Sequence, residues 1–136
     1  QLVESKTAVE GFGKKLKKEG AKKYKAEIKA GKAISKKIEE QIALYIGKVD
    51  KRQGITRNPK ITTVMNRIFL ASNYSRSRPN GLTKTEGTLI VHAKNELKAA
   101  IKKTNAFFNT EWKEYRAKMD SITLPPFKKT ETIKID

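Results

Sequence analysis

Residues 83–122 read TKTEGTLIVHAKNELKAAIKKTNAFFNTEWKEYRAKMDSI, and this stretch decides the fold. Its large side chains recur three, four or seven residues apart, at Ile90, Leu97, Ile101, Thr104, Phe108, Tyr115, Met119 and Ile122. That spacing is typical of a long helix that buries one stripe of its surface. Thr83, followed three residues later by Glu86, forms a capping-box motif and predicts where the helix begins. We therefore expect one helix over residues 83–122.

The heaviest aromatic side chains of this stretch lie on or beside the stripe, at Phe107, Phe108, Trp112 and Tyr115. Residues of these types often dominate the energetics of protein interfaces. Their helical spacing favours burial in a core over exposure at an interface. We interpret the four as core or interface anchors. Two adjacent phenylalanines cannot face the same way, so we expect them to meet different neighbours.

Two further helices are expected upstream. Asn58 is a good helix cap, and Pro59 suits the first helical position because its missing N–H is not needed there, so a short helix is expected over residues 59–76. Residues 5–49 keep a three-four spacing of apolar side chains and are predicted to form one long helix. Gly20 and Gly31 are the points where that helix would bend, break or allow a close neighbour.

These elements predict an all-α fold. The chain has 136 residues, the size of one domain, with 37% hydrophobic and 33% charged residues, a balance typical of helical bundles. We expect an elongated antiparallel three-helix bundle over residues 1–122, with two long helices and one short one. Pro125 and Pro126 would stop the last helix, so residues 123–136 are expected to form an extended tail.

The sequence offers little that could support catalysis or metal binding. It has no cysteine, and His92 is its single histidine, with Glu96 as the nearest candidate ligand, whereas a zinc site needs at least three protein ligands. The carboxylates are scattered, and Gly11-Phe12-Gly13 lacks the rest of a phosphate-binding loop. We expect no enzyme activity, no cofactor and no metal.

The charge distribution points to a second class of function. The net charge is +17, and residues 51–80 contain seven basic residues and no acidic one. A patch of this kind attracts polyanions such as nucleic acid. The alternative is an ordinary solvated surface. The candidate polyanion-binding residues are Lys51, Arg52, Arg57, Lys60, Arg67, Arg76 and Arg78.

The sequence contains no clear signal for its cellular location. No run approaches the ~20 apolar residues that a membrane-spanning helix needs. The sequence begins at Gln1 instead of methionine, and we expect a fragment or a processed product.

Residues 50–115 resemble the C-terminal helical region of large bacterial sortilin-like proteins, which carry Asp-box (BNR) repeats folded as β-propellers. The resemblance is carried by packing and turn residues: Gly54-Ile55, Arg57, Pro59, Val64, Ala71, Gly81 to Thr83, Asn105 to Phe108, Trp112 and Tyr115. Residues 14–37 are rich in lysine and match nothing specific in that family. The resemblance implies an exported protein in which this region is a helical appendage after propeller domains.

The hypothesis that follows is a non-catalytic helical interaction or structural module. Its partner would be a propeller domain or another exported protein, located in the periplasm, at the outer membrane or outside the cell. The alternative hypothesis is a basic helical domain that binds nucleic acid or another polyanion through residues 51–78. For that alternative we expect weak, sequence-independent binding.

Overall fold

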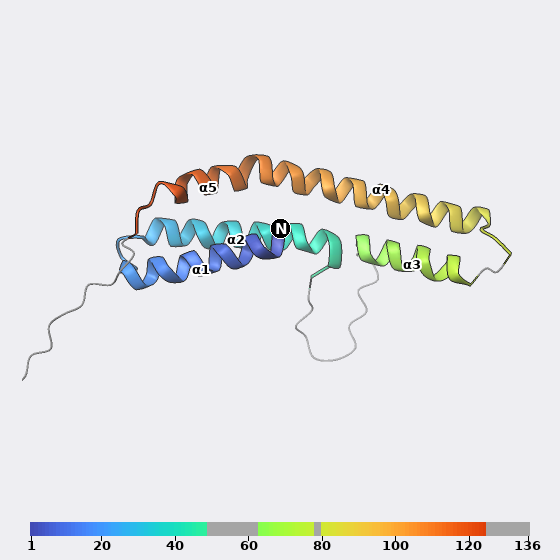
Figure 1. Cartoon of the computed structure of the whole chain (residues 1–136), viewed down its shortest axis with the longest axis horizontal. Helices are drawn as coiled ribbons and strands as arrows, with labels where there is room; N and C mark the ends of the chain where they lie inside the picture. Colours follow the sequence, from blue (N-terminus) through green and yellow to red (C-terminus); the bar gives the residue numbers. More distant parts are fainter. Residues whose placement is uncertain (49–62, 78–79, 125–136) are drawn as a thin grey trace, which may run out of the picture.

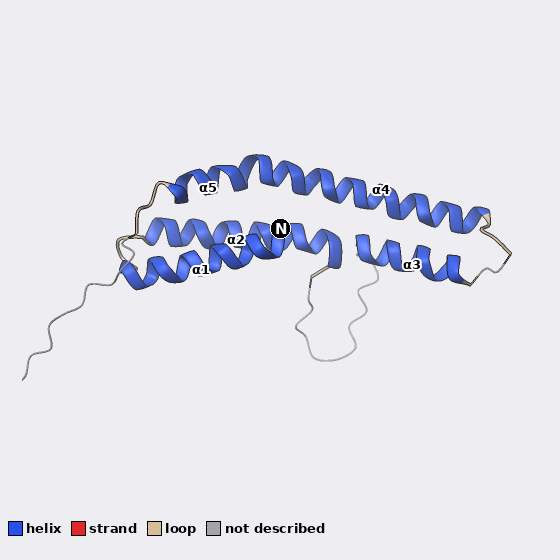
Figure 2. Ribbon diagram, in the orientation of Figure 1, coloured by secondary structure: helices blue, strands red, loops and turns tan. Residues whose placement is uncertain are grey.

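The structure is a computed structural model, and it describes residues 1–48, 63–77 and 80–124. The described residues are helical apart from short turns, and they contain no strand (Figure 2). The elements, in chain order, are α1 (Leu2–Gly20), α2 (Lys25–Ile46), α3 (Val64–Arg76), α4 (Lys84–Phe107), the π-helical turn η1 (Phe108–Trp112) and α5 (Lys113–Asp120).

The molecule is an elongated rod built around its last helix (Figure 1). The elements α4, η1 and α5 follow one another without a break over residues 84–120, which corresponds to about 55 Å at 1.5 Å per residue. The α1–α2 hairpin lies against the α5 end of this helix, and α3 lies antiparallel to its α4 end. Among the described helices, three therefore lie side by side in one part of the rod and two in the other.

The buried core lies in the three-helix part. Val9 of α1, Ile34 and Ile38 of α2, and Phe107 of α4 form its buried cluster. Polar contacts join the same helices: the Tyr45 and Thr104 hydroxyl oxygens lie 2.9 Å apart, and Lys37 Nζ lies 2.7 Å from Glu111 Oε1. This burial fixes α1 and α2 against the long helix.

The long helix expected over residues 5–49 is wrong. It is two helices, because the chain turns back at residues 21–24 and α2 packs antiparallel to α1. Gly20 is where the first helix ends, with a φ of 151° that residues with a side chain rarely adopt. The expected bundle of two long helices and one short one is wrong for the same reason.

The starts of two helices also differ from expectation. The first helix begins at Leu2, before residue 5. The short helix begins at Val64, because Thr63 is extended (φ −102°, ψ 161°) and its hydroxyl accepts a hydrogen bond from the Asn66 N–H at 3.2 Å. The expected start at Asn58-Pro59 lies outside the described residues.

The capping box of the last helix is confirmed. Thr83 precedes α4, and its N–H donates to the Glu86 carboxylate at 2.8 Å. The helix expected to run to residue 122 ends at Asp120. Residues 122–124 are not helical, and the rest of the expected tail lies outside the described part of the chain.

Candidate interaction surface

The seam between α3 and α4 combines three alanines with two larger buried side chains. Positions that recur every seven residues are buried there, namely Val64 and Ala71 on α3, and Glu86, Ala93 and Ala100 on α4. Alanine in a seam lets two helices approach closely, so large side chains beside it are pushed outward.

The large apolar side chains beside this seam are exposed. Each of them follows a buried seam residue at one of three offsets. The offset is one residue for Met65 and Ile101, four for Ile68 and Ile90, and five for Phe69 and Val91. Because α3 and α4 are antiparallel, residues at these offsets fall on the same side of the pair. We name this side the open face; its members are Met65, Ile68 and Phe69 on α3, and Ile90, Val91 and Ile101 on α4. They are 40% to 63% exposed, although side chains of these types are usually buried.

The open face continues a surface that α1 covers elsewhere. Phe108 lies seven residues after Ile101 and therefore on the same flank of the long helix. Phe108 is half-buried and packs against the cluster that includes Val9 of α1. The same flank is thus covered by a third helix in one part of the rod. In the part of the rod that contains α3, none of the described helices covers this flank.

Basic side chains border the open face. Lys94 and Lys98 follow Ile90 and Val91 on the same side of α4, and Arg76 lies one heptad after Phe69 on α3. All three are exposed. Over the described residues of 63–107, the basic residues are Arg67, Arg76, Lys84, Lys94, Lys98, Lys102 and Lys103, whereas the acidic ones are the buried Glu86 and the half-buried Glu96. The surroundings of the open face are therefore positively charged.

Most of the basic block predicted from the sequence cannot be placed. Lys51, Arg52, Arg57, Lys60 and Arg78 lie outside the described residues. Of the two that are described, Arg67 is half-buried and Arg76 is exposed. The structure thus places two of the seven candidates, Arg67 and Arg76, and brings Arg76 to the border of the open face.

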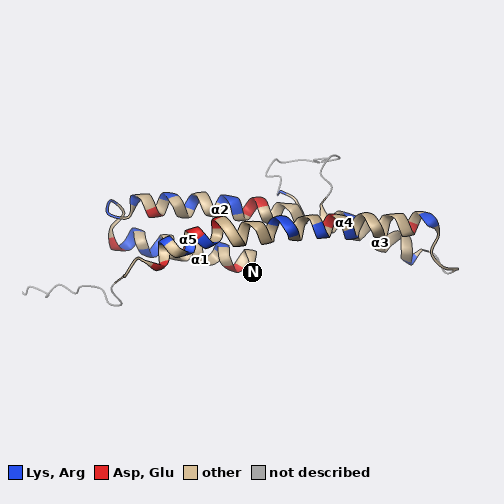
Figure 3. Ribbon diagram, turned by 90° about the horizontal axis from the view of Figure 1, so that it is seen from above, with Lys and Arg blue, Asp and Glu red and all other residues tan. Residues whose placement is uncertain are grey.

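A second basic surface was not identified from the sequence. The turn between α1 and α2 brings together lysines that a continuous helix would spread along about 28 Å of its length. These exposed lysines are Lys14, Lys15, Lys17, Lys18, Lys22, Lys23, Lys25, Lys29 and Lys32, and we name them the hairpin end (Figure 3). Glu19 and Glu27 are the acidic residues within that range.

The four aromatic anchors form a contiguous group in the three-helix part. Phe107 is buried, and Phe108, Trp112 and Tyr115 pack around it half-buried. Ring centroids lie 5.5 Å apart for Phe107–Phe108, 6.2 Å for Phe108–Trp112 and 5.9 Å for Trp112–Tyr115. Burial raises the pKa of the Tyr115 hydroxyl.

The π-helical turn explains how this group fits one side of the helix. A π turn inserts one extra residue, which rotates everything after it by about 100° relative to a regular helix. Trp112, Tyr115 and Met119 are thereby directed toward α1 and α2, and Met119 is buried. Phe107 belongs to the buried core cluster, and the adjacent Phe108 packs against that cluster.

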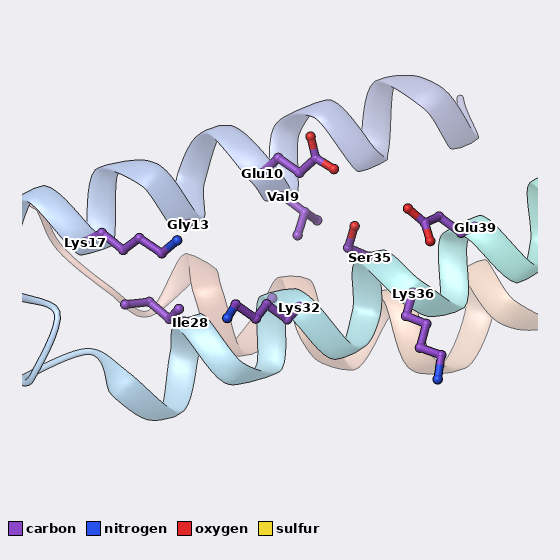
Figure 4. Close-up of a pocket in the computed structure, with 10 residues that line it drawn as sticks. Val9, Glu10, Gly13, Lys17, Ile28, Lys32, Ser35, Lys36 and Glu39 are labelled. Carbon is purple, nitrogen blue, oxygen red and sulfur yellow. The ribbon is translucent and has the colours of Figure 1, made fainter. Parts of the chain in front are cut away.

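Residues of α1 and α2 line a groove between these helices, and its ionisable groups do not converge (Figure 4). Val9 and Ile28 line its apolar part, and Lys36 points away from α1. Lys6 Nζ lies 2.7 Å from Glu39 Oε1 nearby, and this hydrogen bond raises the pKa of Lys6. His92 is exposed, and within residues 1–48, 63–77 and 80–124 no three His, Asp or Glu side chains are placed to share a metal ion.

Comparisons with known proteins identify no relative. The chain matches no protein-family model, and no curated protein or solved structure shows significant similarity to it. Across the described residues, no helix combines the length and apolar character that crossing a membrane requires.

Proposed function

We propose that this chain is a non-catalytic helical interaction module that docks to a protein partner through the open face. The observation that supports the proposal is the row of exposed large apolar side chains on α3 and α4. A group of exposed large apolar side chains on one side of a helical pair is a common mark of a protein-binding site. The neighbouring part of the same rod provides the precedent, because there a third helix covers the corresponding flank.

We also propose the wider setting that the sequence resemblance implies. In that setting the module is an appendage of a larger exported protein with Asp-box (BNR) propeller domains. Its partner is then a propeller domain of the same protein or another exported protein. The support remains the set of packing and turn residues between Gly54 and Tyr115.

Site-specific photo-crosslinking in the source cell tests the docking proposal. A benzophenone amino acid would replace Ile101 on the open face or, as a matched control, Leu70 on the opposite flank of α3. The two positions are similarly exposed, at 43% and 39%. A discrete protein adduct from position 101 and none from position 70 is the expected result. No protein adduct from position 101, or equal adducts from both positions, would refute docking through this face.

A second function, polyanion binding, is favoured by a different observation, the cluster of nine lysines at the hairpin end. Binding that neutralises about six phosphates should weaken roughly a thousandfold between 50 and 200 mM salt. The comparison would use a variant with Lys22, Lys23 and Lys25 changed to serine, and a control variant with Lys102 and Lys103 changed to serine. Equal salt dependence in both variants would remove the hairpin end from consideration.

A further inference from the structure

We propose that the open face binds one amphipathic helix, supplied by a protein partner, whose apolar stripe is flanked by acidic side chains. The inference rests on the proposed docking function and specifies its ligand. Three observations carry it: the geometry of a face that none of the described helices covers, the continuity with α1, and the charge of the border.

The first observation is the geometry of the open face. Two antiparallel helices that meet through alanines leave the large side chains beside the seam pointing outward. Ile68 on α3 and Ile90 on α4 are each about 40% exposed beside that seam, so both retain apolar surface for a third element. The 13 residues of α3 correspond to about 20 Å, which a helix of four turns would cover.

The second observation is that a helix of the chain, α1, already covers the continuation of the open face. Val9 of α1 is buried in a cluster with Phe107 of the long helix, and half-buried Phe108 packs against that cluster. The row of residues that contains Phe108 and Ile101 passes from the covered part into the open one. A helix is therefore the element that suits this row of residues on both sides of the boundary.

The third observation is the charge, which decides between possible occupants. Arg76, Lys94 and Lys98 border the open face and are all exposed. A second copy of this chain would place the same basic border against itself in a symmetric contact, and like charges in apposition oppose binding. Acidic residues beside the partner's stripe would instead form ion pairs with this border.

Titration with designed peptides tests the inference directly. The probe is a fluorescein-labelled peptide of three heptads, with leucine at the first and fourth positions and glutamate at the fifth and seventh. Repulsion between these glutamates prevents the peptide from pairing with itself. The control peptide carries lysine at the same flanking positions. Fluorescence anisotropy with the full chain should show at least about tenfold tighter binding of the glutamate peptide.

Two matched variants locate the binding. Ile101→Glu on the open face should weaken binding of the glutamate peptide by about tenfold or more, whereas Leu70→Glu should change it less than about twofold. Circular dichroism would check that both variants fold. If Ile101→Glu does not fold, the border variant Lys94→Glu/Lys98→Glu should reverse the preference and bind the lysine peptide more tightly.

Four outcomes would overturn the inference. The first two are absence of peptide binding and equal binding of both peptides. The third is that light scattering shows dimers of the free chain and that Ile101→Glu abolishes them. The fourth is that the chain binds phosphatidylglycerol vesicles in a way that requires Ile101 but does not bind the peptide. Photo-crosslinking in the cell distinguishes the proposed docking through the open face from the proposed acidic helix as its ligand. A protein adduct from position 101 with failed peptide binding would leave docking intact and refute the acidic helix.

Discussion

Replacing Ile38 by alanine should destabilise the fold strongly, because Ile38 is fully buried between three helices. It lies on α2 at 0% exposure, in the cluster with Val9 of α1 and Phe107 of α4. The substitution removes three carbon atoms, worth about 2.4 kcal/mol in lost transfer free energy at ~0.8 kcal/mol each. The cavity left behind adds to this, and Ile→Ala changes in cores cost 2–5 kcal/mol, so we expect about 3–4 kcal/mol.

Thermal and urea unfolding, followed by circular dichroism at 222 nm, would measure this loss. At this chain length, 3–4 kcal/mol corresponds to a decrease in Tm of roughly 10–15 °C. The control is Ile101→Ala, which changes a side chain that is 43% exposed and should cost about 1 kcal/mol or less. Equal losses for the two variants, or a loss below about 1 kcal/mol for Ile38→Ala, would refute the assignment of the core to the three-helix part.

Four further predictions follow from local geometry. Gly11→Ala should stabilise the protein by about 0.5–1 kcal/mol, because Gly11 is inside α1 and no atom lies within 4 Å of the added carbon; a loss in urea unfolding would contradict this. Gly20→Ala should destabilise it by about 1 kcal/mol or more, because the φ of 151° is strained for alanine; an unchanged midpoint would contradict a glycine-dependent turn. Thr83→Ala should cost about 1 kcal/mol by removing the capping hydroxyl at α4, again measured by urea unfolding, and a neutral result would argue against the capping box. Burial raises the pKa of Tyr115, so the contribution of its neutral hydroxyl to the free energy of unfolding is complete below the ordinary tyrosine pKa of about 10 and is lost as pH rises through the folded-state pKa. Tyr115→Phe should therefore show a smaller alkaline decrease in stability than the wild type. Identical decreases would contradict this.

The ends of the last helix were predictable because their signals are local. Thr83 and Glu86 identify the N-terminus through direct hydrogen bonding, and this needs no knowledge of the rest of the chain. The end of α5 was misplaced by two residues, which is within the usual uncertainty of a fraying helix terminus.

The break between α1 and α2 was harder to predict, although Gly20 marked the place. Both arms of the hairpin keep a three-four spacing, with Leu16 before the turn and Ile28 after it. A four-residue turn between them disturbs the pattern by about one helical turn, so the apolar period looks continuous across it. The free energy gained when α1 packs against α2 depends on contacts between distant residues, and the spacing of apolar residues does not indicate such contacts.

The open face was missed for a related reason. Spacing shows which residues share a side of a helix, but the expectation that Ile90 and Ile101 lie on a buried stripe is wrong, since they are 40% and 43% exposed. Spacing does not show whether another helix covers that stripe along its whole length. The informative signal is the run of small seam residues Ala93 and Ala100, because close approach through alanine leaves the neighbouring isoleucines outside the seam.

The most direct test of the central claim is thiol accessibility at two matched positions in the source cell. The chain has no cysteine, so the single substitutions Ile101→Cys and Leu70→Cys each introduce one reporter. In the isolated protein, both should react with a maleimide at rates within about twofold, since both side chains are exposed to a similar degree. In the cell, a bound partner should slow the reaction at position 101 by about tenfold or more and leave position 70 unchanged. Unchanged rates at both positions, or equal slowing at both, would contradict docking through the open face.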